Sequence, residues 1–292
     1  MDGEISKRKG NINFKMAIRN NNIANGIKSS ALLGWRIETN WANIFIVFLV
    51  KCSKPFSVAL LLSAMYMIAS GPEATIYDLS WAIIGVCLWG FIQSATELYS
   101  YAIVGEREWF RNIKNIITAP TPLHVYLLGR TSLWIPVGLL NFIVILSISN
   151  YSLNLELDIN SIEKVKIVLF LLLGFIPVVS LGMFVAGISL VIPRFSEGVA
   201  FGVTGVLYLI SGSIIKTDML PTILKNISEA LPFTHWIEII RFMMFPYFRI
   251  NPAPYSEFFI TSIIFCLVTN YLYFYLLNYA RKSGKIDLAS MY

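Results

Sequence analysis

The stretch that decides the fold is residues 167–191, which read IVLFLLLGFIPVVSLGMFVAGISLV. It carries no charged side chain over a length that exceeds the roughly 20 apolar residues a helix needs to cross a bilayer. This stretch therefore predicts a transmembrane helix.

Composition extends that prediction to the whole chain of 292 residues. Hydrophobic residues make up 56% and charged residues 14%, with a mean hydropathy of +0.67. In ordinary globular proteins, hydrophobic residues make up about 45–50% and charged residues about 25%. So few charges could not cover the surface of a soluble protein, and the same figures exclude a disordered chain, a collagen and a disulfide scaffold. Three cysteines beside apolar runs are interpreted as packing residues.

We predict an all-α integral membrane protein with six transmembrane helices. They are expected at about 55–70, 81–104, 131–149, 167–191, 199–215 and 258–280. Residues 31–50 are too mixed to span, and their tryptophans favour an elbow helix lying in the membrane interface. One transmembrane domain then covers 31–282, between tails at 1–30 and 283–292.

The distribution of basic residues predicts the orientation. With six crossings and both termini inside, 17 of the 23 Lys and Arg residues lie on the inner side, as cytoplasmic segments require. The net charge of +6 is thus assigned to membrane topology rather than to nucleic-acid binding. Residues 1–22 carry no apolar run, so no cleavable signal peptide is expected.

The link between the second and third crossings predicts an amphipathic cytoplasmic helix over 106–118. Trp109, Phe110, Ile113, Ile116 and Ile117 follow helical spacing on one face, and charged side chains occupy the other. We expect the apolar face to hold the helix against the membrane domain and the charged face to point to the cytosol. Two interpretations stay open: a helix resting on lipid headgroups, or a docking element for a cytoplasmic partner.

The link between the fifth and sixth crossings predicts two helices too short to span. Pro221 opens one, and the second runs from about Thr234 to Phe245, after Pro232. We expect them to form a re-entrant or interfacial pair on the external side. Glu238 and Arg241 are expected to stabilise this turn by i, i+3 pairing.

These two links carry a family resemblance. The sequence GEREWFRNIKNIITAPTP at 105–122, followed by YLLGR, resembles the stretch after the second helix of type-2 ABC transporter permeases. SG…LP…LPFTHWIEIIR at 211–241 resembles the segment between helices five and six of that family. The resemblance covers about residues 30–282.

The resemblance implies the membrane subunit of an ATP-driven exporter. It implies two ATPase subunits, a second permease copy or homologue, and ATP and magnesium bound by the ATPases only. It also implies that the first link is the coupling helix, whose charged residues are Glu106, Arg107, Glu108, Arg111 and Lys114. Phe110-Arg111 stands where many members have Gly-Thr, and a Tyr-Arg-rich signature typical of polysaccharide exporters is absent. We therefore expect a drug, a lipid or a similar hydrophobic or amphipathic substrate.

Glu97 is the one acid within a predicted crossing. Gln93, Glu97 and Tyr101 share one helix face, and an intramembrane carboxylate faces a cavity or a partner. Either Glu97 pairs with a base near the cytoplasmic end, such as Arg130 at the start of the third crossing, or this face lines a substrate pathway. Both interpretations stay open.

The chain shows no catalytic chemistry of its own. It has no phosphate-binding loop for ATP and no paired carboxylates within a crossing, and its two histidines are too far apart to suggest a metal site. We expect neither enzymatic activity nor a bound cofactor. The alternative function is that of an ATP-independent carrier or a membrane anchor. With either function, the protein is expected in the plasma membrane. A carrier would favour several intramembrane charges, which this sequence lacks.

Overall fold

The computed structural model describes residues 23–40, 76–153, 161–245 and 254–287, with scattered positions between 43 and 65. Within these residues the chain is helical and contains no strand. Most of the predicted first crossing, 55–70, and most of the tail at 1–30 lie outside the described residues. Part of the predicted elbow, from residue 41 onward, also falls largely outside them.

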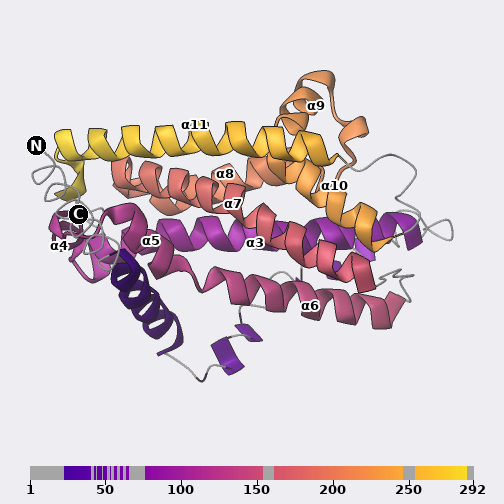
Figure 1. Cartoon of the computed structure of the whole chain (residues 1–292), viewed down its shortest axis with the longest axis horizontal. Coiled ribbons are helices and arrows are strands. Elements are labelled where there is room, and N and C mark those ends of the chain that lie inside the picture. Colours follow the sequence, from indigo (N-terminus) through magenta and orange to yellow (C-terminus); the bar gives the residue numbers. More distant parts are fainter. Residues whose placement is uncertain are drawn as a thin grey trace, which may run out of the picture.

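The elements follow one another through short turns. In chain order they are α3 (Ile76–Val104), η2 (Gly105–Trp109), α4 (Ile113–Thr118), α5 (Leu123–Thr131), α6 (Trp134–Leu153), α7 (Ser161–Val191), η3 (Pro193–Phe195), α8 (Ser196–Ile210), η4 (Thr217–Met219), α9 (Thr222–Glu229), α10 (Pro232–Met244), α11 (Tyr255–Lys282) and η6 (Lys285–Asp287). The long helices α3, α6, α7 and α11 run roughly side by side (Figure 1).

Four of the described segments are long and apolar enough to cross a membrane. They are Ser80–Trp109, Leu123–Ser147, Lys164–Val191 and Tyr255–Lys282. The predicted crossings at 81–104, 167–191 and 258–280 lie within α3, α7 and α11. An all-helical, multi-pass membrane protein is therefore confirmed, whereas the count of six stays a prediction.

Two crossings differ from their predicted bounds. The third, expected at 131–149, is α6 from Trp134 to Leu153, because α5 ends at Thr131 and a turn follows it. The fifth, α8, ends at Ile210 rather than at residue 215, because Gly212 has a φ of 72° and turns the chain. At 15 residues α8 is shorter than a typical crossing.

Helix α3 is the centre of the bundle. In its apolar window 67% of the residues are buried inside the protein, against 22% in α11, which lies at the periphery. It packs on α6, α7, α8 and α10. Its contact with α7 is close because Gly182 lies under the ring of Tyr99, where a Cβ would come within 2.2 Å of Cδ2.

The two predicted link segments lie at opposite ends of the bundle (Figure 1). At one end, which we call the α5 end, η2, α4 and α5 gather near the C-terminal end of α7 and η6. At the other, the α10 end, α10 packs against α7, α11 and the start of α3. Helix α10 is almost wholly buried, whereas α9 exposes Ile223.

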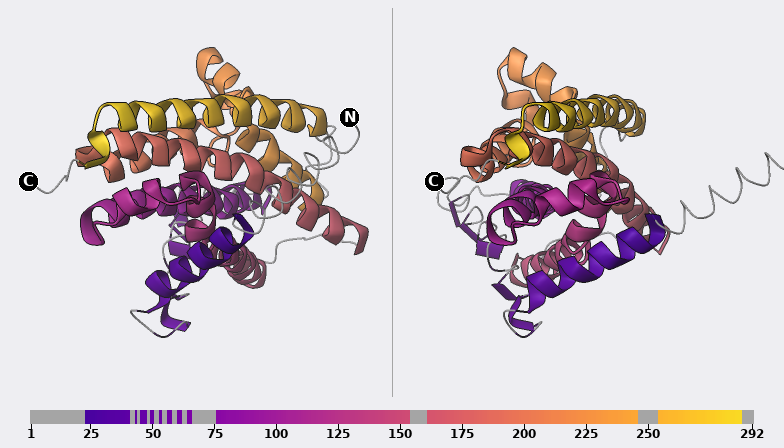
Figure 2. Two further views of the ribbon diagram at one scale, coloured as in Figure 1. Left: turned by 60° about the vertical axis from the view of Figure 1, so that its left-hand side comes forward. Right: turned by 90° about the vertical axis from the view of Figure 1, so that its left-hand side faces the viewer.

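A helix over residues 23–39 packs across α5. Figures 1 and 2 show it, in indigo, lying at an angle to the long helices. A Cβ at Gly34 would lie 2.2 Å from the carbonyl oxygen of Arg130, and one at Gly129 would lie 2.0 Å from Ser30 Oγ. Only glycine allows so close a crossing. The helix begins inside the segment predicted as a polar tail.

Candidate functional site

The α5 end is organised by a wide turn that continues α3. Residues Gly105–Trp109 form a π-helical turn, in which the amide of Phe110 donates to the carbonyl of Gly105 at 2.9 Å. Such turns inside helices are frequent at functional sites. The chain then reverses at Arg111, whose φ is 51°, and re-enters a helix at Ile113.

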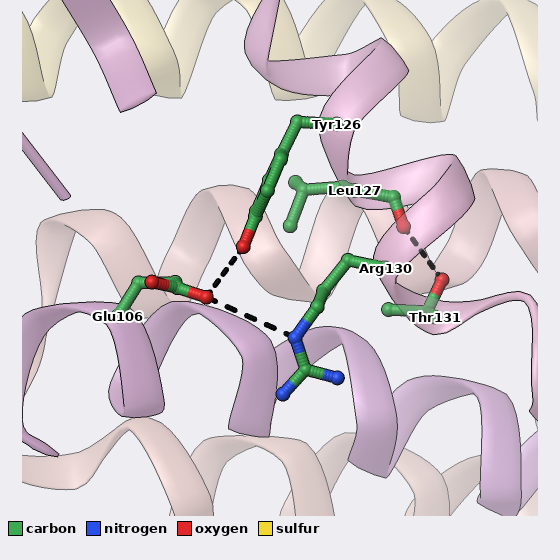
Figure 3. Close-up of polar contacts among 5 residues, drawn as sticks. All are labelled: Glu106, Tyr126, Leu127, Arg130 and Thr131. Atoms are coloured by element: carbon green, nitrogen blue, oxygen red, sulfur yellow. Dashed lines mark hydrogen bonds and ion pairs between the residues drawn. The ribbon is translucent and has the colours of Figure 1, made fainter. Parts of the chain in front are cut away.

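Glu106 is buried in this turn and joins α3 to α5. The hydroxyl of Tyr126 donates to its Oε1, and Arg130 Nε lies 3.8 Å from the same oxygen (Figure 3). Glu106 and Arg130 expose only 3% and 5% of their surface. A buried acid and base compensate each other's lost hydration, so this cluster holds the two helices together.

Arg107 makes a second buried contact, which joins the π turn to α7. Its Nη1 donates to the carbonyl of Ser189 and its Nη2 to that of Leu190, both at 3.0 Å. These carbonyls belong to the last turn of α7, where helix carbonyls lack intrahelical partners and the helix dipole is negative. The guanidinium therefore caps α7 and fixes it to the π turn.

The expected amphipathic helix over 106–118 is corrected by these contacts. The π turn and the reversal at Arg111 divide it, and only Ile113–Thr118 forms the later helix. Glu106 and Arg107 point inward rather than to solvent, because α5 and α7 cover that side. The apolar face is divided too: Ile113 and Ile116 are buried, as expected.

Two aromatic residues of the predicted apolar face are on the surface instead. Trp109 is 60% exposed and Phe110 48% exposed. Arg111 and Lys114 are exposed beside them, and Glu108 is half-buried. We call Trp109, Phe110, Arg111 and Lys114 the exposed turn; it presents aromatic and basic side chains at the α5 end.

The predicted pathway residues line a common cavity of about 430 Å³. Gln93, Glu97 and Tyr101 form part of its α3 wall, which confirms that they share a face. Gln93 Nε2 donates to Glu97 Oε1 at 2.8 Å. The other walls come from the helix over 23–39, α6 and α8. Trp109 belongs both to this lining and to the exposed turn.

Arg130, the base suggested as a partner of Glu97, does not pair with it. Arg130 pairs with Glu106, nine positions further along the chain, because the π turn brings that carboxylate against α5. Glu97 does line the cavity, and whether this face forms a substrate pathway stays a prediction.

Arg241 holds the α10 end together chiefly through backbone carbonyls, and its charge also acts on Glu238, its expected partner. It is 1% exposed and donates to the carbonyls of Trp81, Gly212 and Ser213 at 2.8–3.2 Å. Its guanidinium also lies 3.7 Å from the centroid of the Trp81 ring. These bonds connect the re-entrant segment to α3 and to the chain after α8. The same two regions touch directly, since a Cβ at Gly85 would lie 1.9 Å from Ser213 O.

The remaining residues of the predicted re-entrant segment form local structure. Pro221 precedes α9 and Pro232 is the first residue of α10, so both short helices exist as predicted. Whether the pair enters and leaves the membrane on one side stays a prediction. Burial raises the pKa of Glu238, and the charges of His235 and Arg241 partly oppose that shift.

A family model described as ABC-2 type transporter matches residues 30–245, well over half of the chain. The chain belongs to the ABC-2 type transporter family. It is the permease component of an ABC transporter, a membrane subunit that spans the bilayer several times. No match was found among curated proteins.

In this ABC-2 permease, sequence reasoning missed several residues that complete the two sites. They are Tyr126 at the buried cluster, and Glu38, Trp89, Trp134 and Tyr208 at the cavity. Only Tyr126 gave a signal in advance, since it lies in the YLLGR stretch, four positions before Arg130 on one helix face. The cavity residues come from four helices, so no local pattern connects them.

Proposed function

We propose that this permease exports a hydrophobic or amphipathic substrate from the cytoplasm, driven by ATP hydrolysis on separate ATPase subunits. Two copies of the chain, or one copy and a homologue, would enclose the pathway with two ATPases below. The chain itself would bind neither ATP nor magnesium. The observation that carries the proposal is the exposed turn, joined through its own π turn to buried contacts with α5 and α7.

The α5 end is suited to receive movement from a partner. Aromatic and arginine side chains are the commonest anchors of protein–protein interfaces, and the exposed turn offers Trp109, Phe110 and Arg111. A force on this turn reaches α5 through Glu106 and α7 through Arg107 without a flexible linker. Glu108 and Lys114 would contribute charge at the rim.

The orientation follows from the same assignment. With the α5 end in the cytoplasm, 17 of the 23 bases lie inside, as the positive-inside rule demands. The domain then covers 31–282 with both tails cytoplasmic, and the substrate would leave past α9 and α10. The protein would lie in the plasma membrane.

The test is copurification of a P-loop ATPase with the tagged permease expressed in its own cells. Arg111→Glu with Lys114→Glu should reduce the ATPase recovered per permease by about tenfold or more, because both changes reverse the charge of the docking surface. Trp109→Ala should uncouple ATP hydrolysis from transport. The matched control is Arg194→Glu, an exposed base outside the turn.

The outcomes separate the two functions. Full ATPase recovery and hydrolysis in the double variant would make the turn a simple membrane-surface element. Transport that continues in ATP-depleted cells, with no ATPase recovered, would favour the alternative of an ATP-independent carrier. Absence of any transport would favour an anchor.

A further inference from the structure

Another hollow lies on the outside of the bundle, between α5, α7 and α11, and we call it the α11 groove. It has a volume of about 370 Å³, and none of its described lining residues belongs to the cavity beside α3. All three helices belong to segments long and apolar enough to cross a membrane. The exposed side chains of Leu128, Ile176 and Phe274 form its rim. The groove therefore opens toward the hydrocarbon of the bilayer rather than toward water.

A chain of hydrogen-bonded side chains joins α11 to α7 at this groove. Asn270 Nδ2 donates to Ser180 Oγ at 3.0 Å and to the carbonyl of Cys266 at 2.8 Å. Ser180 Oγ lies 2.6 Å from Thr269 Oγ1, which donates to the carbonyl of Phe265 at 2.7 Å. Ser180 and Thr269 are buried, and this chain engages both hydroxyls. The two bonds of its nitrogen hold the side-chain amide of Asn270 in one orientation.

That orientation leaves one acceptor at the groove. The carbonyl of Cys266 can only accept, so the nitrogen of the Asn270 amide must face it. The amide oxygen accepts no hydrogen bond from the described residues, although Asn270 is exposed and lines the groove. Hydrocarbon offers no water to bond, so a polar group without a partner is costly there. A molecule that brings a hydroxyl group into the groove would remove this cost.

The other lining residues favour a neutral, partly aromatic occupant. The described residues that line the groove include no aspartate, glutamate, lysine or arginine. Phe175, Tyr273 and Phe274 contribute rings, and His124 lies edge-to-face on Phe274 with the ring centroids 5.7 Å apart. Aromatic side chains of this kind pack well against a further ring. The volume falls within the range of small-molecule sites, which is roughly 300–1,000 Å³.

A transmembrane helix of a partner fits the groove less well. Helices pack closely in membranes where small residues allow their backbones to approach. The rim of the α11 groove instead consists of the large side chains of Leu128, Ile176 and Phe274. These side chains would keep the backbone of a second helix away from the amide of Asn270.

We propose that the α11 groove binds neutral hydrophobic alcohols and phenols that are dissolved in the bilayer. The hydroxyl group of the ligand donates to Asn270 Oδ1, and its apolar body lies among the rings of the lining. This site goes beyond the proposed export function, and it stands whether or not ATP drives transport by this chain.

The test is photolabelling of the full chain in lipid nanodiscs with a diazirine derivative of a dialkylphenol. Mass spectrometry of the labelled peptides should place the label on the groove faces of α5, α7 and α11. Thymol should compete about threefold to tenfold more strongly than its methyl ether, because the ether keeps the ring and its alkyl groups but lacks the donor.

Three variants keep the result interpretable. Asn270→Leu should remove the difference between thymol and its ether. Asn278→Leu is the matched control, because it makes the same change at an exposed position of α11 outside the groove, and it should preserve the difference. Ile176→Trp fills the groove from its exposed rim and leaves the hydrogen-bonded chain in place, so it should reduce labelling several-fold. Thermal melting of each variant checks its fold.

Equal competition by thymol and its ether in the wild type would overturn the inference. A label that maps outside the three helices, or that Ile176→Trp leaves unchanged, would also overturn it. The permease should take the same label when it is purified together with its natural subunits. Loss of the label in that complex would show that a partner covers the groove, and the inference would fall.

Discussion

The clusters around Arg130 and Arg241, at the two ends of the bundle, bury positive charge in different ways. At the α5 end, Arg130 faces the carboxylate of Glu106, and Tyr126 completes the cluster. At the α10 end, Arg241 is held by three backbone carbonyls and the face of Trp81. The first arrangement consists of side chains, which can exchange partners when helices move. The second is fixed to the backbone of two other elements, so it resists such movement.

The surroundings of the two clusters agree with this difference. Helix α10, which carries Arg241, also packs an aromatic core, where Trp236 donates to the carbonyl of Phe170 at 2.8 Å and lies over Gly174. The α5 cluster instead adjoins exposed aromatic residues and a backbone reversal at Arg111. The α10 end is therefore built as an anchor and the α5 end as a joint.

The largest effect is expected from Glu106→Lys. This change buries a second cation beside Arg130 and removes the acceptor of Tyr126, so it should cost roughly 3–5 kcal/mol of folding free energy. The measurement is the melting temperature and folded yield in detergent. Glu108→Lys, at a half-buried neighbour, is the control and should cost far less. A Glu106→Lys protein that melts like the wild type would show that the cluster does not hold α5.

The next largest effect is the loss of folding free energy when either of two carbonyl-binding arginines is replaced. Arg241→Met removes four hydrogen bonds and a ring contact, whereas Arg107→Met removes two hydrogen bonds. We expect a loss of about 3 kcal/mol for Arg241 and about half of that for Arg107, since each buried carbonyl left unpaired costs energy. Thermal melts of both variants in one detergent measure the ratio. Equal losses would break the distinction between anchor and joint.

The smallest effect concerns pH at the α10 end. Burial raises the pKa of Glu238, and an acid with a raised folded-state pKa stabilises the fold below its unfolded pKa. That contribution is lost as the pH rises from about 4.3, the ordinary glutamate value, through the raised pKa. The melting temperature should therefore fall over this window in the wild type and fall less in Glu238→Gln. A steeper fall in the variant would reverse the assigned sign.

Helix positions were largely predictable from the sequence, because long apolar runs have few alternatives. The run at 167–191 lies wholly within α7, and 258–280 within α11. The end of α8 was not predictable from hydropathy, since residues 211–215 are still largely apolar while Gly212 turns the backbone. Hydropathy indicates whether a segment lies in the membrane, but it does not determine the backbone φ angle at which a helix ends.

Side-chain orientation at the sites was much less predictable. Helical spacing correctly grouped Gln93, Glu97 and Tyr101, because a face of one helix is a local property. It failed for Glu106, since burial there depends on α5 and on a π turn that breaks the spacing. It could not reveal the carbonyl partners of Arg241, because Trp81 lies 160 positions away in the chain.

The π turn also sets a rotational phase. Each residue of an α-helix turns the chain by about 100°, so one additional residue in a turn rotates everything that follows by about that angle. Glu97 faces the cavity before the turn, and Trp109, the last residue of the turn, reaches the same cavity. The rotation at the π turn thus places Trp109 on the same cavity wall as Glu97. Inserting or deleting one residue between 104 and 110 would rotate the exposed turn and change the direction in which its side chains point. The same change in the 119–122 loop would leave that direction unchanged.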